Sequence, residues 1–101
     1  MSNILKDKEI KQFNSDGAIL LKKKFKKKWI NELRKGINKA KDNPSPRFTN
    51  HTKEKNSPCY LEDFWTWNLH EEFTDFVYNS PSAKIASELL MAKKINLVMD
   101  N

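Results

Sequence analysis

The final segment of the chain, residues 95–100 (INLVMD), is apolar and predicts a β-strand. A compact domain rarely stops inside such a strand, because an unpaired strand exposes its backbone donors and acceptors. A second apolar run, residues 18–22, is bounded by Gly17 and by lysines and predicts one more strand. Two strands are too few to cover the helices that the rest of the chain predicts. We therefore expect an α+β arrangement that forms the first part of a larger, apparently truncated domain.

Hydrophobic periodicity predicts four helices. The clearest spans residues 25–40, where apolar side chains recur at three- and four-residue spacing, and it ends before Pro44. Ser80 and Pro81 predict a helix start, with the serine as N-cap and the proline at the first helical position. Weaker patterns predict a helix at Ile4–Asn14 and one or two helical turns around Phe73–Val77.

An irregular loop is predicted at residues 42–58, which hold three of the four prolines among Asn, Ser, Thr and Lys. Such a long loop is uncommon inside a small self-contained domain. The aromatic segment 60–67 (YLEDFWTW) that follows predicts a strand or a turn. We expect residues 1–101 to form a single partial domain.

Length and composition narrow the class of protein. The chain has 101 residues, which excludes a multidomain enzyme, and its net charge is +6. The basic residues are 17 Lys and only 2 Arg, accompanied by 11 Asn, a pattern that A/T-rich codons also produce. No stretch approaches the roughly 18 apolar residues of a membrane span, and Met1-Ser2-Asn3 opens no signal peptide. The single Cys59 cannot form an internal disulfide, so we expect a reduced, cytoplasmic protein.

Four segments, in this order and spacing, resemble the start of the phytanoyl-CoA dioxygenase family. Residues 13–21 (FNSDGAILL) resemble its "F-x-x-D-G-x-hydrophobic" passage, and residues 62–67 (EDFWTW) resemble an "E-D-F-W-x-W" segment. Residues 80–90 (SPSAKIASELL) are similar to its "S-P-x-x-x-I-A-x-x-L-[LM]" helix. Residues 95–101 resemble the strand that runs toward the family's iron site. The resemblance spans roughly residues 10–101.

The resemblance implies the N-terminal helices and first strands of a double-stranded β-helix (jelly-roll) oxygenase. The complete enzyme would use Fe(II) and 2-oxoglutarate to hydroxylate a small organic or lipid-like substrate. The family's iron ligands, a His-x-Asp pair and a distant His, would lie beyond residue 101. A departure is that residues 91–94 (MAKK) stand where the family usually has a Gly.

Four residues of this chain are candidates for site roles. By the resemblance, Asn101 reaches the 2-oxoglutarate pocket, where its amide can donate to a carboxylate. Tyr60 lies near the place where some members present a Lys to the same cosubstrate, and it keeps only a hydroxyl donor. On a strand, Trp65 and Trp67 would share a face and could line a substrate pocket. Aromatic residues in such a segment more often form core, so packing is the favoured interpretation for both tryptophans.

The chain itself predicts no catalytic residue and no metal ligand. His70 and Glu72 mimic a His-x-carboxylate pair, but a helical turn would point them about 200° apart, so a surface histidine is the better interpretation. His51 lies in the polar loop. Cys59 lacks an identifiable base. We expect neither Fe(II) nor 2-oxoglutarate to bind this chain alone, and we expect no activity from it.

The lysine-rich segment, residues 22–28 (KKKFKKK), supports an alternative function. Six lysines in seven residues suit a small basic module that binds nucleic acid or another anion without catalysis. The favoured interpretation is a solvated helix start with no specific nucleic-acid partner. The partner expected for the complete enzyme is a small-molecule substrate, and the exposed final strand predicts self-association of this chain.

Overall fold

A computed structural model describes residues 3–101. The described residues form four helices and one short sheet. In chain order these are α1 (Asp7–Asp16), α2 (Lys27–Asp42), β1 (Thr49–Asn50), β2 (Leu61–Glu62), α3 (Glu71–Asn79) and α4 (Ser82–Leu90). Residues 1–2, part of the segment from which the absence of a signal peptide was predicted, lie outside the described residues. Within residues 3–101, no helix combines the length and the apolar character that crossing a membrane requires.

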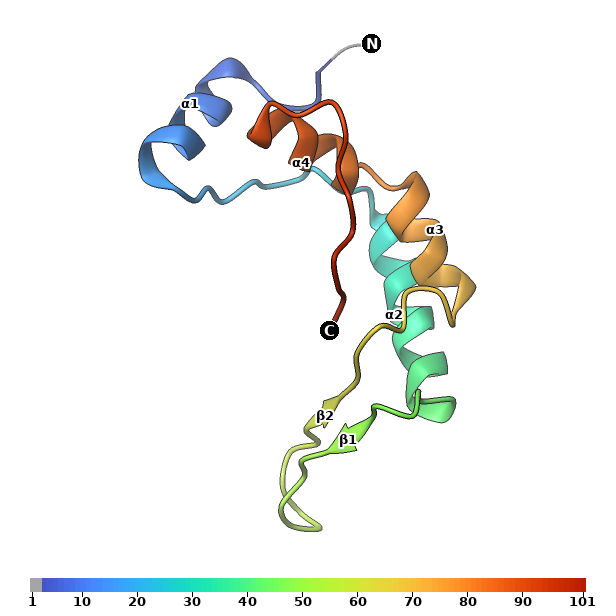
Figure 1. The fold of residues 1–101 in the computed structure, drawn as a ribbon. Coiled ribbons are helices and arrows are strands. Elements are labelled where there is room, and N and C mark those ends of the chain that lie inside the picture. Colours follow the sequence, from blue (N-terminus) through green and yellow to red (C-terminus); the bar gives the residue numbers. More distant parts are fainter. Residues whose placement is uncertain (1–2) are drawn as a thin grey trace.

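The elements form an open arch rather than a closed globule (Figure 1). Helices α1 and α4 lie at one end, α2 and α3 form the middle, and the β1–β2 pair lies at the other end. The last residues run from α4 into the hollow of the arch. The radius of gyration is 16.4 Å, whereas a compact chain of this length has about 13 Å. A large part of the surface therefore borders the hollow.

Helix α1 begins and ends with local capping contacts. The Glu9 carboxylate accepts a hydrogen bond from the Lys6 backbone N–H at 2.9 Å, which satisfies a donor at the helix start. Gly17 closes the helix in the left-handed conformation with φ 78°, and its N–H donates to the Phe13 carbonyl at 2.8 Å. The sequence predicted this glycine turn, and the turn is confirmed, although the helix begins three residues later than expected.

The amino-terminal residues are tied to α4 through one carboxylate. Glu88 accepts hydrogen bonds from the backbone N–H groups of Ile4 at 3.1 Å and Leu5 at 2.8 Å. Burial alone would raise the pKa of Glu88, but these two hydrogen bonds and the Lys84 charge lower it below its ordinary value. Leu5 is buried beside this link, with 5% of its surface exposed. The α1–α4 end is thus held by a long-range polar contact.

Helices α2 and α3 pack through aromatic rings. Trp29 on α2 is 6% exposed, and its ring meets the edge of Phe76 on α3 with centroids 6.0 Å apart. Phe25, just before α2, stacks on the same Phe76 ring at 5.7 Å. Gly36 permits the close approach farther along, because a Cβ there would lie 2.6 Å from a Phe73 ring carbon. The predicted amphipathic helix at residues 25–40 is confirmed, shifted by two residues.

The start of α4 differs by one residue from the sequence prediction. Pro81, rather than Ser80, occupies the N-cap position, and Ser82 is the first helical residue. The Ser80 hydroxyl still accepts a hydrogen bond from the Ser82 backbone N–H at 3.2 Å, so the serine satisfies a free donor of the first turn. At the other end, Met91 ends the helix in the left-handed conformation with φ 51°. The phytanoyl-CoA dioxygenase family usually has a Gly close to this position.

Strand β1 lies where an irregular loop was predicted, whereas β2 lies in residues 60–67, for which a strand or a turn was predicted. Strands β1 and β2 are antiparallel, with Thr49 opposite Glu62 and Asn50 opposite Leu61, and the His51 N–H donates to the Tyr60 carbonyl at 2.7 Å. The prediction that all of residues 42–58 are irregular is therefore wrong for β1. Prolines bracket this strand without entering it, so its backbone donors remain available for pairing.

Neither segment predicted to be a strand is one. Residues 18–22 connect α1 to α2 without strand pairing, and Leu20 is 79% exposed. Residues 95–100 also lie outside any strand. The physical reason is the same for both segments, because a strand needs a neighbour to accept and donate its backbone hydrogen bonds, and no described segment takes that place. The described chain is a mixed helical structure with one two-stranded sheet, and the jelly-roll class stays a prediction.

The hydrophobic core is small. Among the described residues only Leu5, Trp29 and Ile85 are buried apolar side chains. The accessible surface is 8213 Å², whereas a folded monomer of this mass exposes about 6,000 Å². The excess of about 2,200 Å² follows from the open arch and from its exposed apolar side chains.

Candidate functional site

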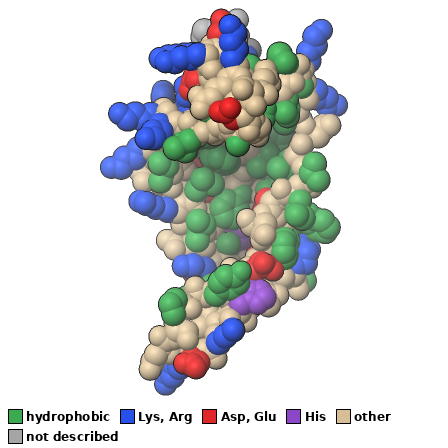
Figure 2. Space-filling model, turned by 90° about the vertical axis from the view of Figure 1, so that its left-hand side faces the viewer, with side chains coloured by type: hydrophobic (Ala, Val, Ile, Leu, Met, Phe, Trp, Pro, Cys, Tyr) green, Lys and Arg blue, Asp and Glu red, His purple; other side chains and the backbone are tan. Residues whose placement is uncertain are grey.

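The hollow of the arch contains a cavity with a volume of about 410 Å³. Figure 2 looks toward this side of the molecule, where hydrophobic side chains gather in the concave face and lysines project around it. Helix α2 contributes Leu33 and Ile37 to the walls, and α3 contributes Phe73, Phe76 and Val77. The cavity is therefore an apolar site whose main walls are two packed helices.

A polar end closes the cavity between β2 and the last residues of the chain. Its lining there includes Asp63, Thr66, Trp67, Asp100 and Asn101. The site thus combines a broad apolar wall with a few hydrogen-bonding groups at one end. This arrangement suits an apolar ligand with a polar group, because the polar residues can fix its orientation.

Asp100 holds the end of the chain against the aromatic segment. One carboxylate oxygen accepts from the Thr66 backbone N–H at 3.1 Å and from its hydroxyl at 3.0 Å. The other oxygen lies 3.4 Å from the Trp67 backbone nitrogen. The Asp100 carbonyl accepts from the Trp65 N–H at 3.1 Å. These bonds, across 33 to 35 residues of sequence, place Asn101 at the cavity wall.

Asp63 organises the other side of the polar end. It accepts hydrogen bonds from the Ser45 hydroxyl and from the backbone N–H groups of Ser45 and Phe64, the last two at 2.8 Å. Burial alone would raise the pKa of Asp63, but these hydrogen bonds and the nearby Arg47 charge bring it below its ordinary value. Asp63 is therefore an ionised structural group that fixes the turn after β2.

Arg47 holds the backbone of the aromatic segment from outside. Its guanidinium donates to the carbonyls of Phe64 at 3.0 Å and Trp65 at 3.2 Å, and it lies over the Trp65 ring at 5.4 Å. Asp63 and Arg47 thus act together to position residues 64–67. The sequence analysis did not single out Asp63, Asp100 or Arg47 for this role. The only available signal was that both carboxylates lie in or beside aromatic or apolar segments.

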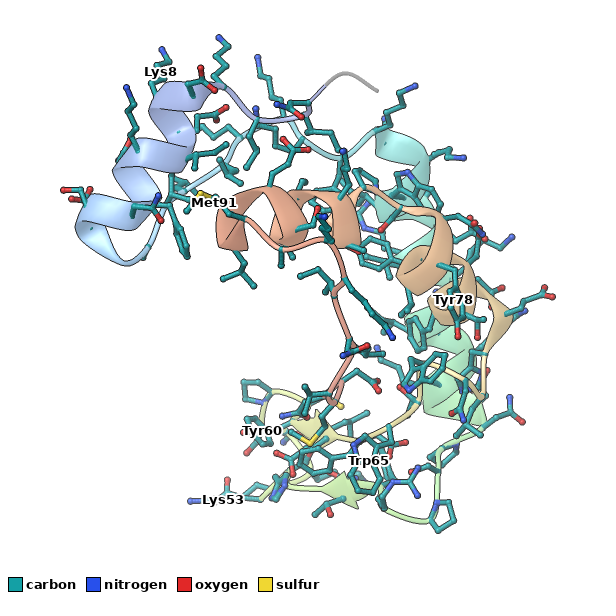
Figure 3. All side chains as sticks on the ribbon, turned by 45° about the horizontal axis from the view of Figure 1, so that its top comes forward. Lys8, Lys53, Tyr60, Trp65, Tyr78 and Met91 are labelled. Carbon is teal, nitrogen blue, oxygen red and sulfur yellow. The ribbon has the colours of Figure 1, made fainter. Side chains whose placement is uncertain are left out.

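The structure separates the two tryptophans that the sequence grouped. Trp65 has φ 53° and is 50% exposed, and it lies at the hairpin end of the arch in Figure 3. Trp67 lines the cavity and meets Tyr78 on α3 edge-on at 6.0 Å. The prediction that the pair shares a face on a strand is wrong, because the segment turns at Trp65. Core packing also fails for Trp65, whereas Trp67 is partly buried against α3.

The two predicted cosubstrate contacts line different pockets. Asn101 lines the cavity of the hollow. Tyr60 is 60% exposed and lines a second pocket of about 420 Å³ at the hairpin, together with His51 and Glu62. The His51 ring meets Tyr60 edge-on at 5.0 Å. Of the four candidate residues, the structure therefore brings together Asn101 and Trp67, and it places Tyr60 and Trp65 outside the cavity.

His70 is buried rather than exposed, so the prediction of a surface histidine is wrong. It is the N-cap residue of α3, 8% exposed, and packs against Phe73 with ring centroids 5.8 Å apart. Its Nε2 atom is buried without a hydrogen-bond partner among the described residues. Glu72, two residues later, is 2% exposed and bonds Lys39 on α2 at 2.6 Å. The Glu72–Lys39 contact therefore links α3 to α2.

The Glu72–Lys39 contact shifts both groups toward their charged forms. The hydrogen bond from Lys39 lowers the pKa of Glu72, and the same bond raises the pKa of Lys39.

Iron(II) of the oxygenase class requires two histidines and one carboxylate in convergent positions. In residues 3–101 no group of three His, Cys, Asp or Glu side chains could hold a metal ion. The described residues therefore do not fit an iron centre.

The lysine-rich segment lies on the connection from α1 into α2. Lys24 forms an ion pair with Glu9 at 3.1 Å, and Lys28 lies over the Trp29 ring at 4.4 Å. Five lysines of the run, 22, 23, 26, 27 and 28, are exposed without an ion pair among the described residues. The prediction that the whole run is the solvated start of a helix is wrong for residues 22–26, which precede α2.

Comparison of the chain with protein-family models, with curated proteins and with solved structures gave no match. The resemblance to phytanoyl-CoA dioxygenases rests on the residues quoted above.

Proposed function

We propose that the chain is the N-terminal part of a phytanoyl-CoA dioxygenase-like oxygenase of the cytoplasm. The complete enzyme hydroxylates a small organic or lipid-like substrate, and Fe(II) and 2-oxoglutarate supply the oxidising chemistry when they are bound. The order of the four resembling segments over residues 10–101 supports this proposal. The single cysteine supports the compartment.

The observation that carries the proposal is the convergence of Trp67 and Asn101 on one apolar cavity. These residues belong to two segments that resemble the family, and Asp100 brings them together through hydrogen bonds to Thr66 and Trp67. An apolar wall suits a lipid-like substrate, and an amide donor suits a carboxylate. The cavity offers an apolar wall along α2 and α3 and the Asn101 amide at its polar end.

Each residue has a defined task in this proposal. Trp67 contacts the apolar part of the substrate and excludes water from that wall. Asn101 donates its amide to a carboxylate of 2-oxoglutarate, and Asp100 positions the segment that carries it. The iron ligands belong to the part of the enzyme beyond residue 101, so no residue of this chain holds the metal.

The experiment begins with the nucleotide sequence after codon 101, which should encode a Lys and Pro/Gly turn and then a His-x-Asp. The protein from the longer reading frame should form succinate from 2-oxoglutarate with added Fe(II). Asn101→Ala should raise its KM for 2-oxoglutarate about tenfold, since one charge-assisted hydrogen bond is lost. Asn96→Ala, an exposed amide on the same segment, is the matched control. An authentic stop codon and an intact protein of 11.9 kDa in cells would contradict the proposal.

The second candidate function, a basic anion-binding module, is favoured by the exposed lysines of residues 22–27. The chain should then bind a nucleic-acid duplex at physiological salt with an affinity that falls steeply as salt rises. The triple variant Lys22→Gln, Lys23→Gln and Lys26→Gln would abolish that binding. If the wild-type chain shows no sub-micromolar binding, the basic module is excluded and the oxygenase proposal stands.

A further inference from the structure

We propose that residues 94–100 form an antiparallel strand pair with the same residues of a second copy of this chain. The two-fold axis passes through Leu97. The proposal concerns the 101-residue chain itself and does not depend on the oxygenase assignment.

The backbone of this segment is unpaired within the described chain as far as Met99. Within the described chain, no backbone hydrogen bond is recorded for residues 93–99. Three of its apolar side chains are also exposed, with Val98 at 91%, Met99 at 52% and Leu97 at 47%. Free donors and acceptors beside exposed apolar side chains are the features that recruit another strand.

The segment is also held by hydrogen bonds at both ends, which restricts the conformations of its backbone. At its start the Ala92 N–H donates to the Ser87 carbonyl of α4 at 3.0 Å. At its end Asp100 is held by the Thr66 and Trp65 contacts at 3.0–3.1 Å. Between these anchors Figure 1 shows the chain running across the hollow as one open stretch. Fixed ends lower the entropy lost when a second strand adds.

The sequence of the segment selects the antiparallel register centred on Leu97. In that register Leu97 faces its own copy, Ile95 faces Met99, and Lys94 faces Asp100 on both sides of the axis. Opposite charges across a strand pair stabilise it. A parallel in-register pair would instead place Lys94 against Lys94, which is unfavourable. Charge complementarity therefore indicates a second copy as the occupant, with one register.

A two-fold arrangement uses the same segment on both copies and closes after two, so the proposed assembly is a dimer and not an open chain of copies.

Sedimentation velocity over a concentration series tests the association and its charge pairs. The wild-type chain should shift from monomer to dimer as concentration rises. Lys94→Glu faces Asp100 with a like charge at two places in each dimer, so it should raise the dissociation constant about tenfold. Lys55→Glu, at an exposed position of the loop between β1 and β2, changes the net charge equally and lies outside this segment, so it should change the constant less than about threefold. A strictly monomeric wild type, or equal effects of the two variants, would overturn the proposal.

Cysteine cross-linking tests the register without relying on dimer strength. In a Cys59→Ser background, Leu97→Cys places two thiols opposite each other with Cβ atoms about 4.5–5.5 Å apart, close to disulfide geometry. Ile95→Cys places its two copies four positions apart along the strands, about 13 Å. Under copper-phenanthroline oxidation, Leu97→Cys should give a covalent dimer at least tenfold faster than Ile95→Cys. Equal rates, or a faster reaction at position 95, would contradict the register and the proposal with it.

Discussion

The α2–α3 pair and the two unpaired segments, residues 18–26 and 92–101, show two ways in which this chain holds its shape. The helices satisfy the hydrogen bonds of their own backbone and pack through aromatic rings, with the centroids of Trp29 and Phe76 at 6.0 Å. The unpaired segments form few backbone hydrogen bonds of their own. Their position depends on single side chains, mainly Asp100. Changes in the helical pair should therefore act on the free energy of unfolding. Changes in the segments should act locally.

The largest effect is expected from Trp29→Ala. This ring is 6% exposed and packs on Phe76, and truncating a buried tryptophan costs about 3–5 kcal/mol. Because few other apolar side chains are buried, the loss should separate α2 from α3. Urea denaturation measures the change. Ile30→Ala, at a neighbouring position that is 44% exposed, should cost less than about 1 kcal/mol, and equal losses for the two variants would remove the contrast.

Gly36→Ala should have the next largest effect. The new Cβ would lie 2.6 Å from a Phe73 ring carbon, and overpacking of this kind costs about 1–3 kcal/mol. Higher helix propensity of alanine, about 1 kcal/mol, opposes part of that loss. Thermal unfolding should show a lower midpoint for Gly36→Ala and a partial recovery in Gly36→Ala with Phe73→Leu. Asn38→Ala, on the exposed face of α2, is the control and should not lower the midpoint.

Sequence reasoning was accurate where structure is local. The periodicity of residues 25–40 predicted α2, and Gly17 predicted the end of α1, because helices and their caps are decided by neighbours within one turn. It failed at residues 18–22 and 95–100, because apolar composition cannot report whether a partner strand is present. It did not identify Gly36, although a glycine inside an amphipathic helix often marks a close approach of another element.

Prediction of the site was limited for the same reason. Trp67 and Asn101 meet through Asp100, whose partners lie 33 to 35 residues away. No spacing rule predicts such contacts. Trp65 and Trp67 were grouped by strand alternation, which the positive φ at Trp65 interrupts. His70 was placed on the surface because a short helical pattern does not show which side chains are buried by tertiary packing.

Asp100→Asn should loosen the segment without unfolding the helices. The variant keeps the side-chain shape but loses the charge that strengthens hydrogen bonds to Thr66 and Trp67, worth about 1–2 kcal/mol locally. Hydrogen exchange at the amides of residues 65–67 should accelerate about tenfold, and exchange in α2 should stay unchanged. Asn96→Asp, which adds a carboxylate on the same segment, is the control. Uniform acceleration across α2 would show that the segment is part of the helical body.

The smallest predicted effect is a decrease in the free energy of unfolding at acidic pH. Glu9, Asp63, Glu72 and Glu88 have a pKa below the ordinary value in the folded chain. Their contribution to the free energy of unfolding is therefore complete above the unfolded pKa, near 4 to 4.5, and it is lost as the pH falls through the lower folded values. Urea titrations between pH 6 and pH 3 should show this decline. Glu88→Gln should flatten it, whereas Glu54→Gln, in the exposed hairpin loop, should leave the slope unchanged.

Residue-resolved hydrogen exchange at two protein concentrations tests most directly whether a packed helical pair carries two unpaired segments. The account predicts slow exchange in α2 and α3 at both concentrations and fast exchange at residues 18–25 throughout. It predicts fast exchange at residues 93–99 in the dilute monomer, with protection gained only at the higher concentration. Protection of residues 18–25 and 93–99 in the monomer equal to that of α2 would contradict it.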